Sequence, residues 1–231
     1  MTEIKNRFES ICSTIRQAES DSNRSEKAVQ LLAVSKTWPA DKLRTIAELG
    51  QAKFGENYLQ EAIAKIHALV DLDLEWHFIG PIQSNKTRDI AALFDWVQTV
   101  DRLKIAKRLN EQRPQDLPPL NVCIQVNIDD EDTKSGVSAQ DILPLAEAIQ
   151  ACDQLTLRGL MIIPARHDNE IAQADAFERA FKLYQSLQAK FEGIDTLSMG
   201  MTADMRLAIK HGSTMVRIGT ALFGQRDTRP D

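Results

Sequence analysis

The chain has 231 residues, 43% of them hydrophobic, and its 28 Lys and Arg against 33 Asp and Glu give a net charge of -5. This length and composition suffice for a sizeable hydrophobic core, and the mild acidity disfavours nucleic acids and anionic membranes as partners. Charges such as Glu3, Lys5 and Arg7 interrupt residues 1–20, so no apolar run suited to secretion or membrane insertion is present there, and we expect a cytoplasmic protein.

The chain begins with an amphipathic helix in residues 1–20, in which Ile4, Phe8, Ile11 and Ile15 recur at helical spacing. Short apolar runs then alternate with helical segments. These runs predict strands at residues 31–36, 53–57, 75–80, 96–100, 120–128, 155–163, 195–200 and 214–220. We predict helices from Pro39 to about Gly50 and at residues 58–70, 84–93, 101–113, 138–153, 171–190 and 203–211.

Repeated alternation of strand and helix requires parallel pairing with right-handed crossovers. Eight such units predict an α/β protein, a single (β/α)8 TIM-type barrel with an extra N-terminal helix. Because no linker divides the chain, we expect one domain over residues 1–231, with the barrel in residues 31–224. An open doubly wound sheet is the alternative, but no GxGxxG follows the first strand.

Barrels of this kind bind ligands at the carboxyl ends of their strands. The residues predicted to meet there are Lys36 from the first strand, Asn57 from the second, Ser198 and Met199 from the seventh, and Arg217, Gly219 and Thr220 from the eighth. They combine an amine, an amide, hydroxyls, a guanidinium and a glycine in one mouth.

Lys36 shares a strand face with Leu32 and Val34, so it points into the barrel if that face does. Apolar walls would disfavour its charged form, lower its pKa and free the amine to attack an aldehyde. Taken alone, a lysine at a strand end is more often an exposed terminus.

The segment around strands seven and eight suits a phosphate group. Ser198 and Thr220 offer hydroxyls, and Gly219 permits close approach of the backbone. A tight turn alone would also account for the glycine. Arg217 shares a face with Met215 and Gly219, and either points inward toward a ligand or outward to a salt bridge with a helix.

Several segments together resemble one known family. They are AVSKT at 33–37, FGENY at 54–58, WHFIG at 76–80, QSNK at 83–86, KSG at 134–136, GLM at 159–161, LSMGM at 197–201 and GSTMVRIGT at 212–220. On these motifs the chain resembles, almost from end to end, the pyridoxal 5'-phosphate (PLP) homeostasis proteins, whose barrel is like the N-terminal domain of alanine racemase.

The resemblance implies PLP as the cofactor and Lys36 as the lysine that forms a Schiff base with it. It also implies Arg217 at the pyridine nitrogen, Asn57 near the ring, and Ser198, Gly219 and Thr220 around the phosphate, and we place Met199 in the same cofactor-binding set. The sequence departs from the family pattern at Trp38, where a basic residue is frequent, and at Thr202 and Ala203, which replace a serine and an acidic residue.

Racemisation needs a proton donor on each face of its intermediate, and in the resembling racemases one is a tyrosine of a further domain. The only tyrosines here are Tyr58 and Tyr184, and we expect no second domain. We therefore predict a monomeric carrier without catalytic residues or metal, which delivers PLP to PLP-dependent apo-enzymes. The alternatives are a PLP-dependent racemase or lyase with weak activity and a phosphosugar-binding barrel. Lys134, after the acidic residues 129–132, is a candidate exit lysine.

Overall fold

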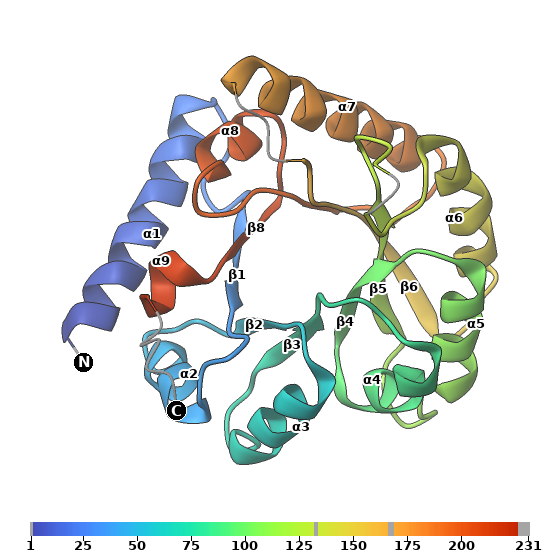
Figure 1. Cartoon of the computed structure of the whole chain (residues 1–231), viewed down its shortest axis with the longest axis horizontal. Coiled ribbons are helices and arrows are strands. Elements are labelled where there is room, and N and C mark those ends of the chain that lie inside the picture. The colour runs from blue at the N-terminus through green and yellow to red at the C-terminus, as the bar shows by residue number, and fades with distance from the viewer. Residues whose placement is uncertain (1, 132–133, 166–168, 226–231) are drawn as a thin grey trace.

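The computed structural model describes residues 2–131, 134–165 and 169–225, which form a closed barrel of eight parallel strands. The strands follow one another around the barrel in chain order, and β8 pairs with β1 to close the ring (Figure 1). The strands are β1 (Gln30–Val34), β2 (Lys53–Glu56), β3 (Glu75–Phe78), β4 (Trp96–Val100), β5 (Leu120–Val126), β6 (Leu155–Ile162), β7 (Thr196–Ser198) and β8 (Met215–Ile218).

Helices cover the outside of this ring (Figure 1). They are α1 (Thr2–Asp21), α2 (Ala40–Ala47), α3 (Leu59–Ala68), α4 (Thr87–Leu93), α5 (Leu103–Gln112), α6 (Ile142–Gln150), α7 (Glu170–Gln188), α8 (Met205–Lys210) and the short α9 (Thr220–Phe223). Two 3-10 turns, η1 (Ser84–Lys86) and η2 (Ala139–Asp141), precede α4 and α6. The predicted (β/α)8 barrel with an extra N-terminal helix is confirmed.

Most strands are shorter at their carboxyl ends than predicted. β1 stops at Val34, because the amide of Trp38 donates to the carbonyl of Ser35 at 3.0 Å and turns the chain. β8 stops at Ile218, because the carbonyl of Gly219 accepts the amide of Leu222 at 2.9 Å and begins α9. The candidate residues that we placed at strand ends therefore include several that lie in the first turn beyond the strand.

The two faces of each strand meet different apolar layers. Ala33 of β1 packs outward into the large core between strands and helices, together with residues such as Leu43 and Ile46 of α2. Leu32 packs inward with Met215 in a small cluster inside the barrel. The predicted alternation of faces along β1 is thus confirmed.

The N-terminal helix α1 lies against the barrel beside α8 and α9 (Figure 1). Ile4, Ile11 and Ile15 are buried in this contact and Phe8 is partly buried, as the helical spacing predicts. As a result, the first helix of the chain borders the last strand and helix of the barrel.

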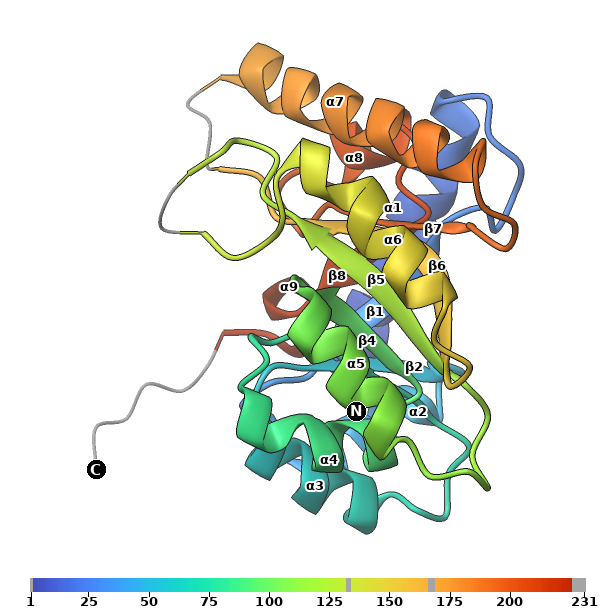
Figure 2. The same ribbon diagram turned by 90° about the vertical axis from the view of Figure 1, so that its right-hand side faces the viewer.

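Because the strands are parallel, all their carboxyl ends open on one rim of the barrel. Figure 2 shows the barrel from the side, with the arrow of β5 pointing toward that rim. The loops after the strands, together with α9, build the surface at this end. The ligand-binding mouth predicted from the sequence must lie there.

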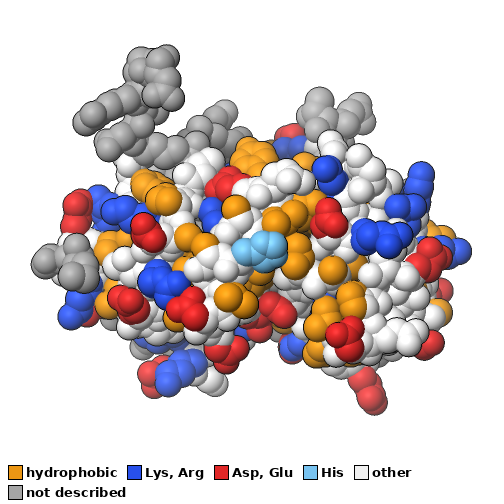
Figure 3. All heavy atoms as spheres, turned by 90° about the horizontal axis from the view of Figure 1, so that it is seen from below, with side chains coloured by type: hydrophobic (Ala, Val, Ile, Leu, Met, Phe, Trp, Pro, Cys, Tyr) orange, Lys and Arg blue, Asp and Glu red, His pale blue; other side chains and the backbone are white. Residues whose placement is uncertain are grey.

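The surface offers no single-sign patch on the face seen in Figure 3, where Lys and Arg are interspersed with Asp and Glu. In the part of the chain that the structure describes, none of the helices combines the length and the apolar character that crossing a membrane requires. The mixture of positive and negative side chains on this face is consistent with the mild net charge.

Candidate functional site

A cavity of about 590 Å³ opens at the carboxyl ends of β1 and β8. Four of the predicted residues line it, namely Lys36, Arg217, Gly219 and Thr220. The other lining residues are Arg7, Val34, Met201, Thr202, Ala203, Ala221, Gly224 and Gln225. The structure therefore brings an amine, a guanidinium, a glycine and a hydroxyl to one cavity.

Lys36 occupies the turn that follows β1, two residues beyond Val34. Val34 packs with Leu32 inside the barrel, so this face of the strand points inward, which the sequence had left open. The residue is half-buried, and the prediction of a lysine enclosed by apolar walls is met only in part. Lys36 lines the cavity and remains partly exposed to solvent.

Arg217 points into the barrel and is only 5% exposed. Its Nη1 donates to the carbonyl and to the hydroxyl oxygen of Ser198 at 2.8 and 2.9 Å, and its Nη2 donates to the carbonyl of Ile162 at 2.9 Å. Burial lowers the pKa of Arg217 to about 10, so it is charged at neutral pH. Three of its five N–H groups are used in this way, and its Nε–H and the second N–H of Nη2 donate to none of the described residues. The outward salt bridge is excluded.

A column of polar side chains continues from Arg217 through the interior of the barrel. The hydroxyl of Ser198 donates to Oε1 of Gln98 at 2.7 Å, and Nε2 of Gln98 donates to Nδ1 of His77 at 2.9 Å. Nε2 of His77 lies 2.7 Å from Oε1 of Glu75, which also accepts from Lys53 at 2.5 Å.

The two ends of this column fix its direction. Arg217 can only donate hydrogen bonds and an ionised Glu75 can only accept them, so each group between them points its acceptor toward the arginine. His77 accepts at Nδ1, so its proton is on Nε2, and burial lowers its pKa and keeps it neutral. The column holds the guanidinium of Arg217 without an adjacent carboxylate.

Ser198 and Met199 do not line the cavity. Both are fully buried, and the hydroxyl of Ser198 is engaged by Gln98 and Arg217. Ser198 therefore contacts the arginine that borders the cavity and offers the cavity no free hydroxyl.

Asn57 lies just beyond β2 and is half-buried, and it too is absent from the cavity lining. Its Oδ1 is buried without a hydrogen-bond partner among the described residues. An unsatisfied buried oxygen of this kind calls for a partner that the protein itself does not supply.

Gly219 and Thr220 line the cavity at the end of β8, next to β1. A Cβ on Gly219 would lie 3.2 Å from the carbonyl oxygen of Val34, so a glycine fits this contact best. The amides of Thr220 and Ala221 donate to no group in the described part of the chain. Two free amides and a hydroxyl beside a glycine are suited to an anion.

Reasoning from the sequence did not assign Arg7, Thr202, Ala203 or Gly224 to the site. Arg7 of α1 lies against Gly224, where a Cβ would stand 2.2 Å from its Nη1. Gly224 has a φ of 101°, which a glycine adopts readily. Thr202 and Ala203 had been noticed only as departures from a family pattern, and nothing in the sequence connects α1 with the mouth.

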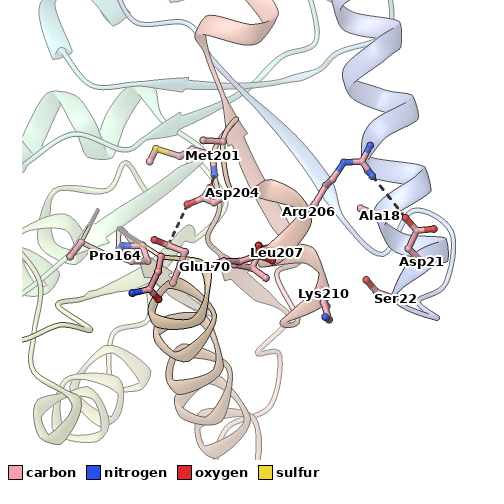
Figure 4. Close-up of a pocket in the computed structure, with 14 residues that line it drawn as sticks. Ala18, Asp21, Ser22, Pro164, Glu170, Met201, Asp204, Arg206, Leu207 and Lys210 are labelled. Carbon is pink, nitrogen blue, oxygen red and sulfur yellow. Dashed lines mark hydrogen bonds and ion pairs between the residues drawn. The ribbon is translucent and has the colours of Figure 1, made fainter. Parts of the chain in front are cut away.

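A larger cavity of about 920 Å³ lies beside this one between α1, α7 and α8 (Figure 4). It shares Met201 and Ala203 with the smaller cavity but contains neither Lys36 nor Arg217. Arg206 of α8 pairs with Asp21 of α1 at 3.9 Å beside this cavity, and Figure 4 marks this ion pair. The larger volume therefore does not identify the functional site.

Lys134 also stands apart from the cavity, in the loop after β5. It pairs with Glu131 at 3.2 Å, and the neighbouring residues 132–133 lie outside the described ranges. In residues 2–131, 134–165 and 169–225, no group of His, Cys, Asp and Glu is arranged to hold a metal ion.

Comparisons with known proteins agree on one family. The family model of the alanine racemase N-terminal domain matches residues 14–227. The pyridoxal phosphate homeostasis protein of Vibrio alginolyticus is 52% identical over 231 residues, covering 98% of this chain and 99% of that protein. The protein of the same name from Pseudomonas aeruginosa is 53% identical over 227 residues, covering 98% and 97%.

A solved structure is similar over the whole barrel. The PipY protein of Synechococcus elongatus, determined with PLP bound, is 35% identical. Its TM-score is 0.83, and the match covers 96% of this chain and 100% of that one.

The polar column predicts a specific acid sensitivity. Burial raises the pKa of Glu75, but hydrogen bonds from His77 and Lys53 outweigh this and lower the pKa from 4.5 to about 2. The carboxylate therefore stabilises the fold above about pH 4.5, and this contribution disappears as the pH falls toward 2. We expect Glu75→Gln to reduce the free energy of unfolding at pH 7 by about 1 to 2 kcal/mol, allowing for its partial exposure.

Urea denaturation of both proteins between pH 7 and pH 2.5 measures this difference, which should shrink as the pH falls. Glu178→Gln, on the exposed face of α7, is the control and should change the stability much less. A difference between wild type and Glu75→Gln that stays constant with pH would contradict the assignment.

Proposed function

This chain belongs to the alanine racemase N-terminal domain family and to its pyridoxal phosphate homeostasis proteins, and we propose that it binds PLP in the cavity between Lys36 and Thr220. The observation that carries the proposal is the meeting of Lys36, Arg217 and Gly219 at one cavity of about 590 Å³. When bound, PLP supplies an aldehyde that forms a reversible Schiff base with a lysine amine.

The groups around the cavity fit the three parts of this cofactor. Lys36 is the only lysine among the residues described as lining it, so it is the amine available to the aldehyde. The free amides of Thr220 and Ala221 and the hydroxyl of Thr220 suit the phosphate. The Oδ1 of Asn57, without a partner among the described residues, lies just beyond the neighbouring strand β2 and would suit a donor group of the ring.

Arg217 suits the pyridine nitrogen because its Nε–H remains available while its other nitrogens are bound. An arginine donates a hydrogen bond without giving up its proton. A ring nitrogen held in this way stays unprotonated, so the cofactor is a weak electron sink. Ser198 assists by orienting Arg217, and Met199 fills the buried space behind the mouth.

We further propose that the protein holds and delivers PLP and is not a dedicated enzyme. The hydroxyl of Tyr184 accepts from Gln188 in the helical layer, and the exposed Tyr58 does not line the cavity. In the described cavity lining, no tyrosine faces Lys36 as a second acid or base. Recipients would be PLP-dependent apo-enzymes.

The finer features of this role are also proposals. We propose that the protein acts as a monomer with one binding domain, because Lys36, Arg217 and Thr220 of the same barrel meet at the cavity. The three cysteines are free thiols, and Cys123 is buried against Trp96 and Met161, which supports a reducing cytoplasmic setting.

The Schiff base is tested by trapping it. Borohydride reduction of the PLP-loaded protein, followed by peptide mass analysis, should find a pyridoxyl group on Lys36. Lys36→Met removes the amine and should abolish the adduct, whereas Lys42→Met, on the exposed face of α2, should retain it. A pyridoxyl group found instead on Lys65, Lys134 or another lysine would overturn the assignment.

The phosphate site is tested at Thr220. Thr220→Val keeps the shape of the side chain but removes its hydroxyl. Because the variant loses a hydrogen bond to a charged group, its affinity for PLP should fall about tenfold or more. Pyridoxal, which lacks the phosphate, should bind both proteins equally. Spectroscopic titration measures both affinities, and an equal loss for the two ligands would place the phosphate elsewhere.

The carrier role is tested on one preparation that is assayed for both transfer and turnover. We expect loaded protein to restore activity to a PLP-dependent apo-enzyme, and we expect no racemase or lyase turnover of amino acids at an enzyme-like rate. Turnover at such a rate would favour the enzyme alternative.

A further inference from the structure

Lys36 is carried by a turn in an uncommon backbone conformation. The turn runs from Ser35 to Trp38, closed by the 3.0 Å hydrogen bond from the amide of Trp38 to the carbonyl of Ser35. Thr37, its third residue, has a φ of 68°, in the left-handed region that a β-branched residue rarely adopts. Something outside the turn must hold it in this state.

A second lysine provides that hold. Lys65 of α3 is only 4% exposed, and its Nζ has three donors. These reach the carbonyl of Ser35 and Oε1 of Glu56, each at 2.7 Å, and Oε1 of Glu61. The ammonium of Lys65 is thus fully engaged, unlike that of Lys36.

The same carboxylates also grip the turn directly. Oε1 of Glu56 accepts the hydroxyl of Ser35 at 2.6 Å, and Oε1 of Glu61 accepts the amide of Thr37. The residues on both sides of Lys36 are therefore bound to the end of β2 and to α3, while the side chain of Lys36 takes no part in the cluster.

An ionic cluster is a costly way to join a helix to a strand. Glu56 is fully buried and Lys65 nearly so, and apolar side chains of similar volume commonly pack as well or better in such a place. What apolar side chains cannot supply is hydrogen bonds to the carbonyl of Ser35 and the amide of Thr37. These are the contacts that set the direction of the turn.

We propose that Lys65, with Glu56 and Glu61, is a positioning cluster that keeps Thr37 left-handed and thereby aims the amine of Lys36 into the cavity. The inference rests on the proposed function, because positioning Lys36 matters only if Lys36 binds PLP. Without the cluster, Thr37 relaxes to a right-handed or extended conformation, and the amine of Lys36 turns away from Gly219 and Thr220.

The variant that tests this is Lys65→Met, which keeps most of the length of the side chain and removes its charge. Without Lys65, PLP binding itself has to hold Thr37 in its unfavourable left-handed conformation. We therefore expect the dissociation constant of the variant for PLP to rise about tenfold or more. Adding Thr37→Gly should restore the affinity to within about threefold of wild type, because glycine adopts this φ without strain. Lys42→Met is the matched control and should bind PLP like wild type.

A second measurement needs no cofactor. Amide hydrogen exchange of the apo protein should be faster in the peptide spanning residues 35–40 of Lys65→Met and unchanged in β4 and β5. If loss of Lys65 leaves Glu56 unpaired and the variant does not fold, Glu61→Gln serves instead. It removes a partly exposed charge from the amide of Thr37 and should show the same exchange effect and the same rescue by Thr37→Gly.

Three results would overturn the proposal: PLP affinity unchanged in both variants, exchange in residues 35–40 unchanged, or no rescue by Thr37→Gly. Rescue by Thr37→Gly separates positioning from general stabilisation, because a glycine in the turn does not repair a weakened contact between α3 and β2. Failure of the proposed function is recognised separately, since wild type would then carry no pyridoxyl group on Lys36 while the exchange difference in the apo protein remained measurable.

Discussion

The pairing of β8 with β1 is the interaction on which the candidate site depends. In this ladder Leu32 stands opposite Arg217 and Ala33 opposite Ile218, so the residues after each strand emerge side by side. Lys36 follows one strand and Gly219 follows the other, although more than 180 positions separate them in the chain. A shift of register by one residue would turn Arg217 outward and remove it from the cavity.

The pairing of β8 with β1 places the charged guanidinium of Arg217 inside the barrel, where the polar interior has to stabilise it. A buried guanidinium without a partner is costly, and no described carboxylate lies in direct contact with that of Arg217. Ser198, Gln98 and His77 present a series of aligned acceptors that ends at Glu75 near the opposite end of the barrel. The polar core therefore orients Arg217, which lines the cavity with two of its five N–H groups unused by the described residues.

Two lysines near the mouth have opposite roles because their partners differ. Lys65 uses all three of its donors on oxygen atoms and is held as a structural cation. Lys36, within a turn bound on both sides, keeps its amine free at the cavity. The two lysines thus differ in whether their hydrogen bonds are satisfied within the fold.

The sequence by itself indicated eight strand and helix units and placed Lys36, Arg217, Gly219 and Thr220 at or just beyond strand ends, because strand periodicity and parallel connections are local patterns; only the pairing of β8 with β1 decided for the closed barrel over an open sheet. Only the tertiary structure decided that Ser198 and Met199 lie behind the cavity, that Arg7 of α1 borders it, and that Lys65 grips the turn of Lys36. These contacts join residues from different elements, and periodicity reports the face on which a side chain lies without identifying the partner it meets once the barrel closes.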